Sequence, residues 1–125
     1  MRTIIAGSRN ITNYGVVASA MAQVLKEGMV VSKVLCGGAS GVDSNGAVWA
    51  DRAGVVVEYH PADWSKGKGA GMLRNCAMAK AADALVAIWD GKSRGTGHMI
   101  NEATRRGLRV WVFDKMGVLR GNSGG

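Results

Sequence analysis

The chain has 125 residues, of which 47% are hydrophobic and 20% charged, and its formal net charge is +7. A chain of this length forms one hydrophobic core, and its composition is that of an ordinary globular domain. No apolar run approaches about 18 residues, and the opening apolar stretch is too short for a signal peptide. We therefore expect a cytoplasmic protein without a membrane partner, and the positive charge predicts an anionic ligand of a kind that charge alone does not identify.

Apolar runs and helical stretches alternate along the chain. In chain order, the pattern predicts strand 3–6, helix 13–27 capped by Thr12, strand 30–36, helix 42–53, strand 55–59, helix 70–82, strand 84–89, helix 96–106 and strand 109–113. The strands are continuously hydrophobic, which is typical of a parallel sheet covered by helices on both faces. The sequence thus predicts an α/β fold with three layers and a mainly parallel sheet of about five strands.

The chain contains no internal repeat and no boundary between domains. We expect a single domain over residues 1–114, followed by a flexible C-terminal tail over 115–125 that ends in GNSGG. Crossovers between parallel strands are right-handed, so the loops that follow the strands gather at one edge of the sheet. Ligands of open α/β sheets bind at that carboxyl edge, and many of the 19 glycines fall there.

The first two of these loops have features of an anion site. Gly7-Ser8-Arg9 supplies a hydroxyl and a planar guanidinium, which suit a phosphate or a carboxylate. The loop 37–43 places glycines between a strand and a helix, where exposed backbone N–H groups favour phosphate. It is neither a Walker A sequence nor a GxGxxG fingerprint. Ser40 and Asp43 have the spacing of a capping box, and Asp43 has the alternative role of contacting a ribose hydroxyl.

The later loops add further polar groups. Arg74 falls near the start of a helix, where a cation is unfavourable unless an anion lies nearby, and Asn75 is equally a site residue or a surface residue. The segment 93–98 again resembles a phosphate loop, in which Thr96 can cap the helix and donate a hydroxyl. Trp64 either stacks on a base or anchors its loop. His98 is more typical of a surface or packing residue than of a catalyst.

The predicted ligand-binding residues share a position at the carboxyl edge or in the loops beside it. They are Gly7, Ser8, Arg9, Gly37, Gly38, Ala39, Gly41, Asp43, Trp64, Arg74, Asn75, Asp90, Ser93, Arg94, Gly95 and Thr96. Cys36 and Cys76 have no metal-ligand spacing and are expected to be free thiols. We expect neither a metal nor a cofactor.

The motifs IIAGSR, CGGASGVD, PADW, GxxRN, ADALVAIWDGKSRGT and HMINEA, from Met1 to about Val112, resemble the YspA/YpsA-related branch of the SLOG superfamily. That superfamily includes the LOG phosphoribohydrolases, which activate cytokinins, and the DNA-processing protein DprA. The resemblance implies a Rossmann-like sheet, a pocket for a nucleotide or nucleotide-derived molecule, a bacterial or phage origin, and self-association as a homo-oligomer.

The resemblance to the LOG enzymes is incomplete at the catalytic motif. Their arginine matches Arg74 and their glycine-threonine loop matches Gly95-Thr96, but the two glutamates that follow are replaced by His98 and Met99. Cleavage of an N-glycosidic bond needs a carboxylate, and methionine supplies none. The favoured function is therefore binding of a nucleotide signal. The alternatives are a phosphoribohydrolase that uses Arg74 with Glu102 or Asp90, and DprA-like binding of nucleic acid.

Overall fold

One sheet of six strands organises the chain in the computed structural model, which describes residues 1–124. The strands are β1 (Arg2–Gly7), β2 (Lys33–Cys36), β3 (Val56–Tyr59), β4 (Ala84–Ile88), β5 (Arg109–Phe113) and β6 (Leu119–Ser123). They lie in the order β3-β2-β1-β4-β5-β6, and all neighbours are parallel except β5 and β6. The direction of strand addition reverses between β1 and β4, as in a Rossmann-like sheet.

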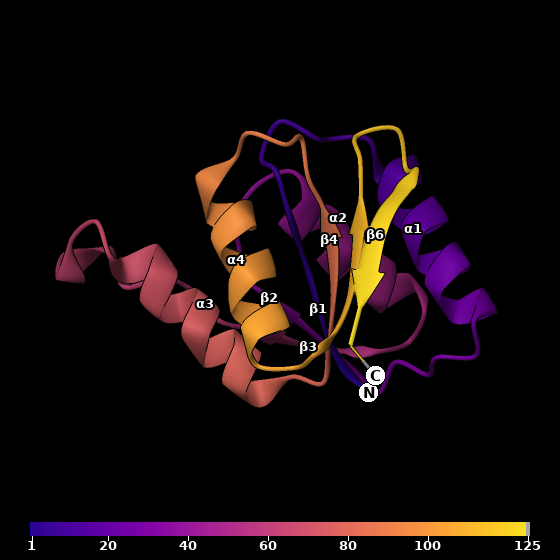
Figure 1. The fold of residues 1–125 in the computed structure, drawn as a ribbon, viewed down its shortest axis with the longest axis horizontal. Helices are drawn as coiled ribbons and strands as arrows, with labels where there is room; N and C mark the ends of the chain where they lie inside the picture. The colour runs from indigo at the N-terminus through magenta and orange to yellow at the C-terminus, as the bar shows by residue number, and fades with distance from the viewer. Residues whose placement is uncertain (125) are drawn as a thin grey trace.

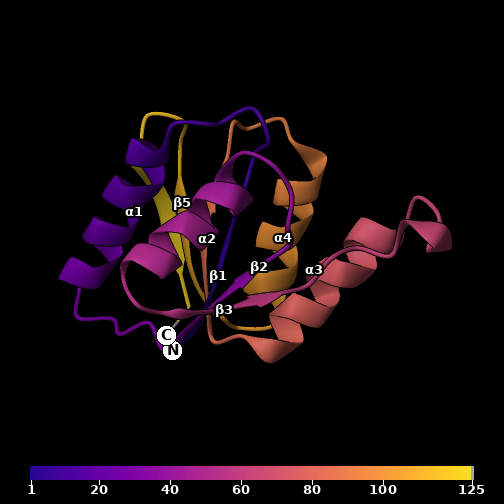
Figure 2. The same cartoon turned by 180° about the vertical axis from the view of Figure 1, so that it is seen from behind.

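Helices cover both faces of this sheet (Figures 1 and 2). They are α1 (Tyr14–Lys26), α2 (Val42–Arg52), α3 (Ala70–Ala81) and α4 (Arg94–Arg105), with a short 3₁₀ helix η1 (Trp64–Lys66) before α3. Helices α1 and α2 pack on one face, and α3 and α4 pack on the other. The predicted three-layer α/β fold is confirmed. No helix within residues 1–124 is both long and apolar enough to cross a membrane.

The alternation of side chains along the strands explains the continuous hydrophobic runs. On β1, Ile5 packs in the core beneath α1 and α2, whereas Ile4 packs in the core beneath α3 and α4. Val34 and Leu35 divide in the same way on β2, and all four side chains are fully buried. Both faces of a central strand in a parallel sheet are covered, so successive positions along it are apolar rather than alternating.

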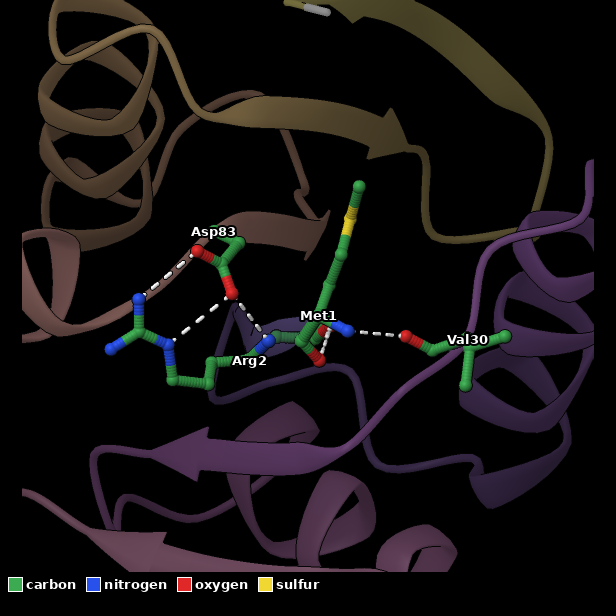
Figure 3. A network of polar contacts seen from close by, with 5 residues as sticks. Met1, Arg2, Val30 and Asp83 are labelled. Carbon is green, nitrogen blue, oxygen red and sulfur yellow. Dashed lines mark hydrogen bonds and ion pairs between the residues drawn. The ribbon is translucent and has the colours of Figure 1, made fainter.

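Polar contacts hold the amino edge of the sheet, opposite the loops that are predicted to bind a ligand (Figure 3). The backbone N of Arg2 donates to Asp83 Oδ2 at 2.8 Å, and its guanidinium pairs with Asp83 Oδ1 at 3.1 Å. The N-terminal ammonium of Met1 donates to the Val30 carbonyl oxygen at 2.6 Å. These contacts tie the start of β1 to the segments that enter β2 and β4.

The C-terminal segment differs from the predicted flexible tail. Leu119–Ser123 forms β6, which pairs with β5 through main-chain hydrogen bonds and adds a sixth strand to the sheet. Asp114 organises the turn, because its Oδ1 accepts from the backbone N of Met116 and Val118 at 2.9 and 3.0 Å. All five residues of β6 are exposed, so no hydrophobic alternation marks this strand in the sequence.

The starts of three helices also differ from expectation. Asn13, rather than Thr12, caps α1 by accepting from the backbone N of Gly15 at 2.8 Å. The N-cap of α2 is Gly41, so the predicted capping box at Ser40 is wrong. Helix α4 begins at Arg94 with Ser93 as its N-cap, which places Thr96 inside the first turn. Thr96 therefore does not cap the helix.

Candidate functional site

A pocket of about 410 Å³ opens at the carboxyl edge of the sheet, where β1 and β4 lie side by side. Its walls come from the end of β1, the loops after β2 and β4, and the facing sides of α3 and α4. This is the point at which the strand order reverses, where open α/β sheets bind their ligands. The volume is within the range of small-molecule sites.

Most of the predicted ligand-binding residues line this pocket. Those that do are Gly7, Ser8, Arg9, Ala39, Asp43, Arg74, Asn75, Asp90, Ser93, Gly95 and Thr96. Four lining residues were not among the predictions, namely Ala6, Asn10, Met78 and Met99. Met78 follows Arg74 by four residues and so shares its face of α3, which is a sequence signal that could have identified it.

Three predicted residues lie outside the pocket lining and are exposed. Trp64 is on η1 with 60% of its surface exposed, and its ring lies over Gly71 rather than over the pocket. Arg94 is the first residue of α4, and Gly38 lies in the loop after β2 with φ of 79°. Figures 1 and 2 show the segment that leads into α3 extending beyond the sheet, and η1 with Trp64 belongs to this segment.

Gly37 and Gly41 also lie outside the lining, but both are buried behind it. A Cβ at Gly37 would stand within 2.9 Å of both Arg74 Nη1 and Asp43 Oδ2, so this glycine leaves room for both side chains. Gly41 has φ of 74° and packs against the Arg9 carbonyl, where a Cβ would lie 2.5 Å from the oxygen. These glycines therefore let the loops after β1 and β2 pack closely.

The Arg74 side chain is held by the ends of two strands. Its Nη1 donates to the carbonyl oxygens of Gly37 at 2.8 Å and His60 at 3.4 Å, and its Nε donates to Asn75 Oδ1 at 3.0 Å. Within residues 1–124 these bonds leave Nη2 without a hydrogen-bond acceptor. A guanidinium that is braced on one side and open on the other is preorganised for an anionic oxygen.

Asn75 connects α3 to α4 beside the pocket. Its side chain is 5% exposed, and Nδ2 lies 3.1 Å from both the Gly95 carbonyl oxygen and His98 Nδ1. Since Oδ1 accepts from Arg74 and Nδ2 donates to Gly95, the orientation of the amide is fixed by its neighbours. Asn75 thus positions Arg74 and the start of α4 relative to each other.

Asp43 is a buried carboxylate in the first turn of α2. It is 6% exposed, accepts from the backbone N of Ala39 at 3.3 Å, and also receives a backbone hydrogen bond from Gly7. Removal from water raises the pKa of Asp43, and the hydrogen bonds and the nearby Arg74 and Arg9 charges oppose that rise. Because the carboxylate faces the pocket, it can accept a hydrogen bond from a ligand hydroxyl.

Asp90 fixes the loop between β4 and α4. Its backbone N donates to Ser8 Oγ at 3.0 Å, and its Oδ1 accepts from the backbone N of Lys92 and Ser93, both at 2.8 Å. The Ser93 hydroxyl donates to Oδ2 at 3.1 Å. The two backbone donors are the main reason that the pKa of Asp90 is lowered to about 2. Ser93 therefore makes no cap, and the first N–H groups of α4 have no side-chain partner.

Glu102, the predicted alternative catalyst, lies outside the pocket lining. Arg105 Nη2 donates to both of its carboxylate oxygens at 2.7 and 2.8 Å, and Arg106 Nε donates to Oε1 at 2.8 Å. These bonds, with that of Arg105 first, lower the pKa of Glu102 to about 2. Met99, three residues earlier on the same helix, does reach the pocket lining, but it is 1% exposed and carries no ionisable group.

The low pKa of Glu102 makes its contribution to stability dependent on pH. The folded state holds this carboxyl ionised below its ordinary pKa of 4.5, so the contribution is complete above pH 4.5 and disappears toward pH 2. We expect Glu102→Gln to lower the urea midpoint at pH 6, and the difference from the unmodified chain to shrink steadily as the pH falls to 2.5. A difference that stays constant from pH 6 to pH 2.5 would contradict this assignment.

Comparison with known proteins identifies the family of the chain. Residues 1–67 match the model of YAcAr, the YspA, cpYpsA-related SLOG family. The chain is also 38% identical over 119 residues to the gene 61 protein of Mycobacterium phage D29, an alignment that covers 90% of this chain and 95% of that relative. No solved structure gives a significant match. The chain belongs to the YspA, cpYpsA-related SLOG family.

Proposed function

We propose that the chain binds a nucleotide or a nucleotide-derived small molecule in the carboxyl-edge pocket, and that it senses or sequesters this molecule. The observation that carries the proposal is the Arg74 guanidinium, held by the Gly37 and His60 carbonyl oxygens with Nη2 left open, in the wall of a pocket at the reversal of strand order. The SLOG family to which the chain belongs supports a nucleotide-related ligand.

The phosphate would lie between Arg74 and the start of α4. Gly95 and Thr96 line the pocket in the first turn of that helix, where backbone N–H groups have no helical acceptor and the helix dipole favours an anion. Arg9, in the loop after β1, adds a second, exposed guanidinium to the pocket lining. Two guanidinium groups and one helix terminus together favour a ligand with at least one phosphate.

The rest of the pocket suits the sugar and the base. Asp43 offers a carboxylate oxygen to a ribose hydroxyl, and its burial strengthens such a hydrogen bond. Met78 and Met99, both about 1% exposed, supply an apolar floor against which a ring can pack. The pocket lining therefore combines the charged, polar and apolar groups that suit the phosphate, ribose and base of a nucleotide.

Binding without hydrolysis is favoured by the positions of the carboxylates. Glycoside cleavage needs a carboxylate free to activate water or to stabilise the sugar cation. Asp90 is engaged by two backbone N–H groups and a hydroxyl, and Glu102 is engaged by two arginines. Neither group is available as a base, so a phosphoribohydrolase that uses Arg74 with Glu102 or Asp90 has less support than binding.

Isothermal titration calorimetry of the full chain against nucleoside monophosphates, cyclic nucleotides, ADP-ribose, the matching nucleosides and inorganic phosphate tests the proposal. We expect micromolar or tighter binding for at least one nucleotide and much weaker binding for its nucleoside. No binding of any nucleotide in the micromolar range would overturn it. Release of free base, followed by chromatography, would identify the hydrolase instead. Binding of single-stranded DNA with a steep salt dependence would identify a nucleic-acid protein.

A further inference from the structure

Three potential metal ligands meet between α3 and α4, next to the nucleotide pocket but outside its lining. Cys76 is on α3, and His98 and Glu102 are on α4. One ligand atom from each lies within 4.8 Å of the other two, with Glu102 buried and the other two half-buried. His98 and Glu102 are four residues apart, which places them on one face of α4. No sequence motif marks this group, because 22 residues separate Cys76 from His98.

We propose that Cys76, His98 and Glu102 form a binding site for a single Zn²⁺ ion. Thiolate, imidazole and carboxylate are the three ligand types that zinc takes in proteins, and three protein ligands leave a fourth position for water. Zinc bonds of about 2.0–2.3 Å place tetrahedral ligand atoms about 3.4 Å apart. The donors, which lie within 4.8 Å of one another, therefore need to approach by at most about 1.4 Å, a distance within the reach of a change in side-chain rotamer.

The arginines around Glu102 do not close this site. Arg105 is 68% exposed and can return to water, while Arg106 bonds only Oε1 and leaves Oε2 able to accept a further partner. The Cys76 thiol is near enough to Glu102 to help lower the pKa of that carboxyl. Zinc would replace the thiol proton between these two groups, releasing that proton to solvent as the thiolate forms.

Metal binding at His98 would also release Asn75. Asn75 Nδ2 donates to His98 Nδ1, so a metal on Nδ1 removes this acceptor directly. A metal on Nε2 has the same effect, because Nδ1 must then carry the proton and can no longer accept. Asn75 lines the nucleotide pocket and orients Arg74, so the metal site and the pocket share one side chain. Occupation of one is thus expected to change the affinity of the other.

Titration of the untagged full chain with Co²⁺ and then Zn²⁺ tests the proposal. We expect one Co²⁺ per chain, with a sulfur-to-cobalt charge-transfer band and visible bands of a four-coordinate site, both abolished by one equivalent of Zn²⁺. Cys76→Ser should remove the charge-transfer band, and His98→Ala should weaken Zn²⁺ binding at least about tenfold. Asn75→Ala should tighten Zn²⁺ binding, because the competing hydrogen bond is lost.

The chain supplies matched controls, since it has two cysteines and two histidines in all. Cys36→Ala and His60→Ala should leave the cobalt spectrum unchanged, because Cys36 lies in the core beneath α1 and α2 and His60 pairs with Glu58. Circular dichroism verifies that each variant is folded. Absence of the charge-transfer band in the unmodified chain, or its survival in Cys76→Ser, would overturn the proposal. Neither result depends on nucleotide binding.

Discussion

Replacing Arg74 with alanine is expected to weaken nucleotide binding by about 100-fold. The guanidinium is the one charged donor in the pocket wall that the described part of the chain holds in place, through the Gly37 and His60 carbonyl oxygens. A hydrogen bond to a charged group contributes about 1.5–3 kcal/mol, which corresponds to about 10- to 150-fold in Kd. Calorimetry with the tightest nucleotide of the panel measures the loss.

The conservative Arg74→Lys variant separates charge from geometry. Lysine keeps the positive charge but cannot bond two strand ends and Asn75 while also presenting a further donor to the ligand. We expect it to lose about tenfold or more. Arg52→Lys is the matched control, because Arg52 lies at the end of α2 and stacks on Tyr14, with its Cζ 4.5 Å from the ring centroid. Equal affinities for the Arg74→Ala variant and the unmodified chain would place the ligand elsewhere.

Arg74 also illustrates how much of the site is predictable from the sequence. A cation near the start of a helix is unfavourable, and this local conflict with the macrodipole by itself indicates a functional position. In the folded chain the cation has partners, since the two strand-end carbonyl oxygens accept from its Nη1 and the Asp43 carboxylate lies nearby. The gathering of the strand-end loops at one edge is also predictable, because the topology of a parallel sheet brings these loops together.

Other features are not predictable because they depend on contacts between distant residues or on the main chain. Strand β6 is held by backbone pairing with β5 and has no buried side chain. The ring of Trp64 is of a kind that stacks on bases, but its loop extends beyond the sheet. The sequence makes Glu102 a candidate catalyst only because it follows Met99 by three residues on the same helix. Its pairing with Arg105 and Arg106 follows from the i,i+3 and i,i+4 spacing along the chain, whereas its proximity to Cys76 follows only from the packing of α4 against α3.

Replacing Gly7 with alanine is expected to lower the free energy of unfolding by about 3 kcal/mol. An added Cβ would overlap the Ile88 carbonyl oxygen and lie 2.8 Å from Val42 Cβ. The carbonyl belongs to β4, and Gly7 of β1 pairs directly with Ile88 in this register. Neither strand can therefore move away from the added Cβ without separating β1 from β4. Overpacking in a well-ordered core costs about 1–3 kcal/mol, and a backbone obstacle puts this position at the upper end. Urea denaturation measures the change.

Gly95→Ala is the matched control, because Gly95 also lines the pocket but a Cβ there would meet no atom within 4 Å. Gly95 lies in the first turn of α4, where alanine is expected to leave the stability unchanged or to raise it by up to about 1 kcal/mol. If both variants keep their stability but lose the ligand, then Gly7 serves close approach of the ligand. If only Gly7→Ala loses stability, then this glycine serves the packing of β4 and α2 against the end of β1. The positions of Ile88 and Val42 favour the second result. Gly7 therefore contributes to the pocket by letting the end of β4 and the start of α2 pack closely against the end of β1.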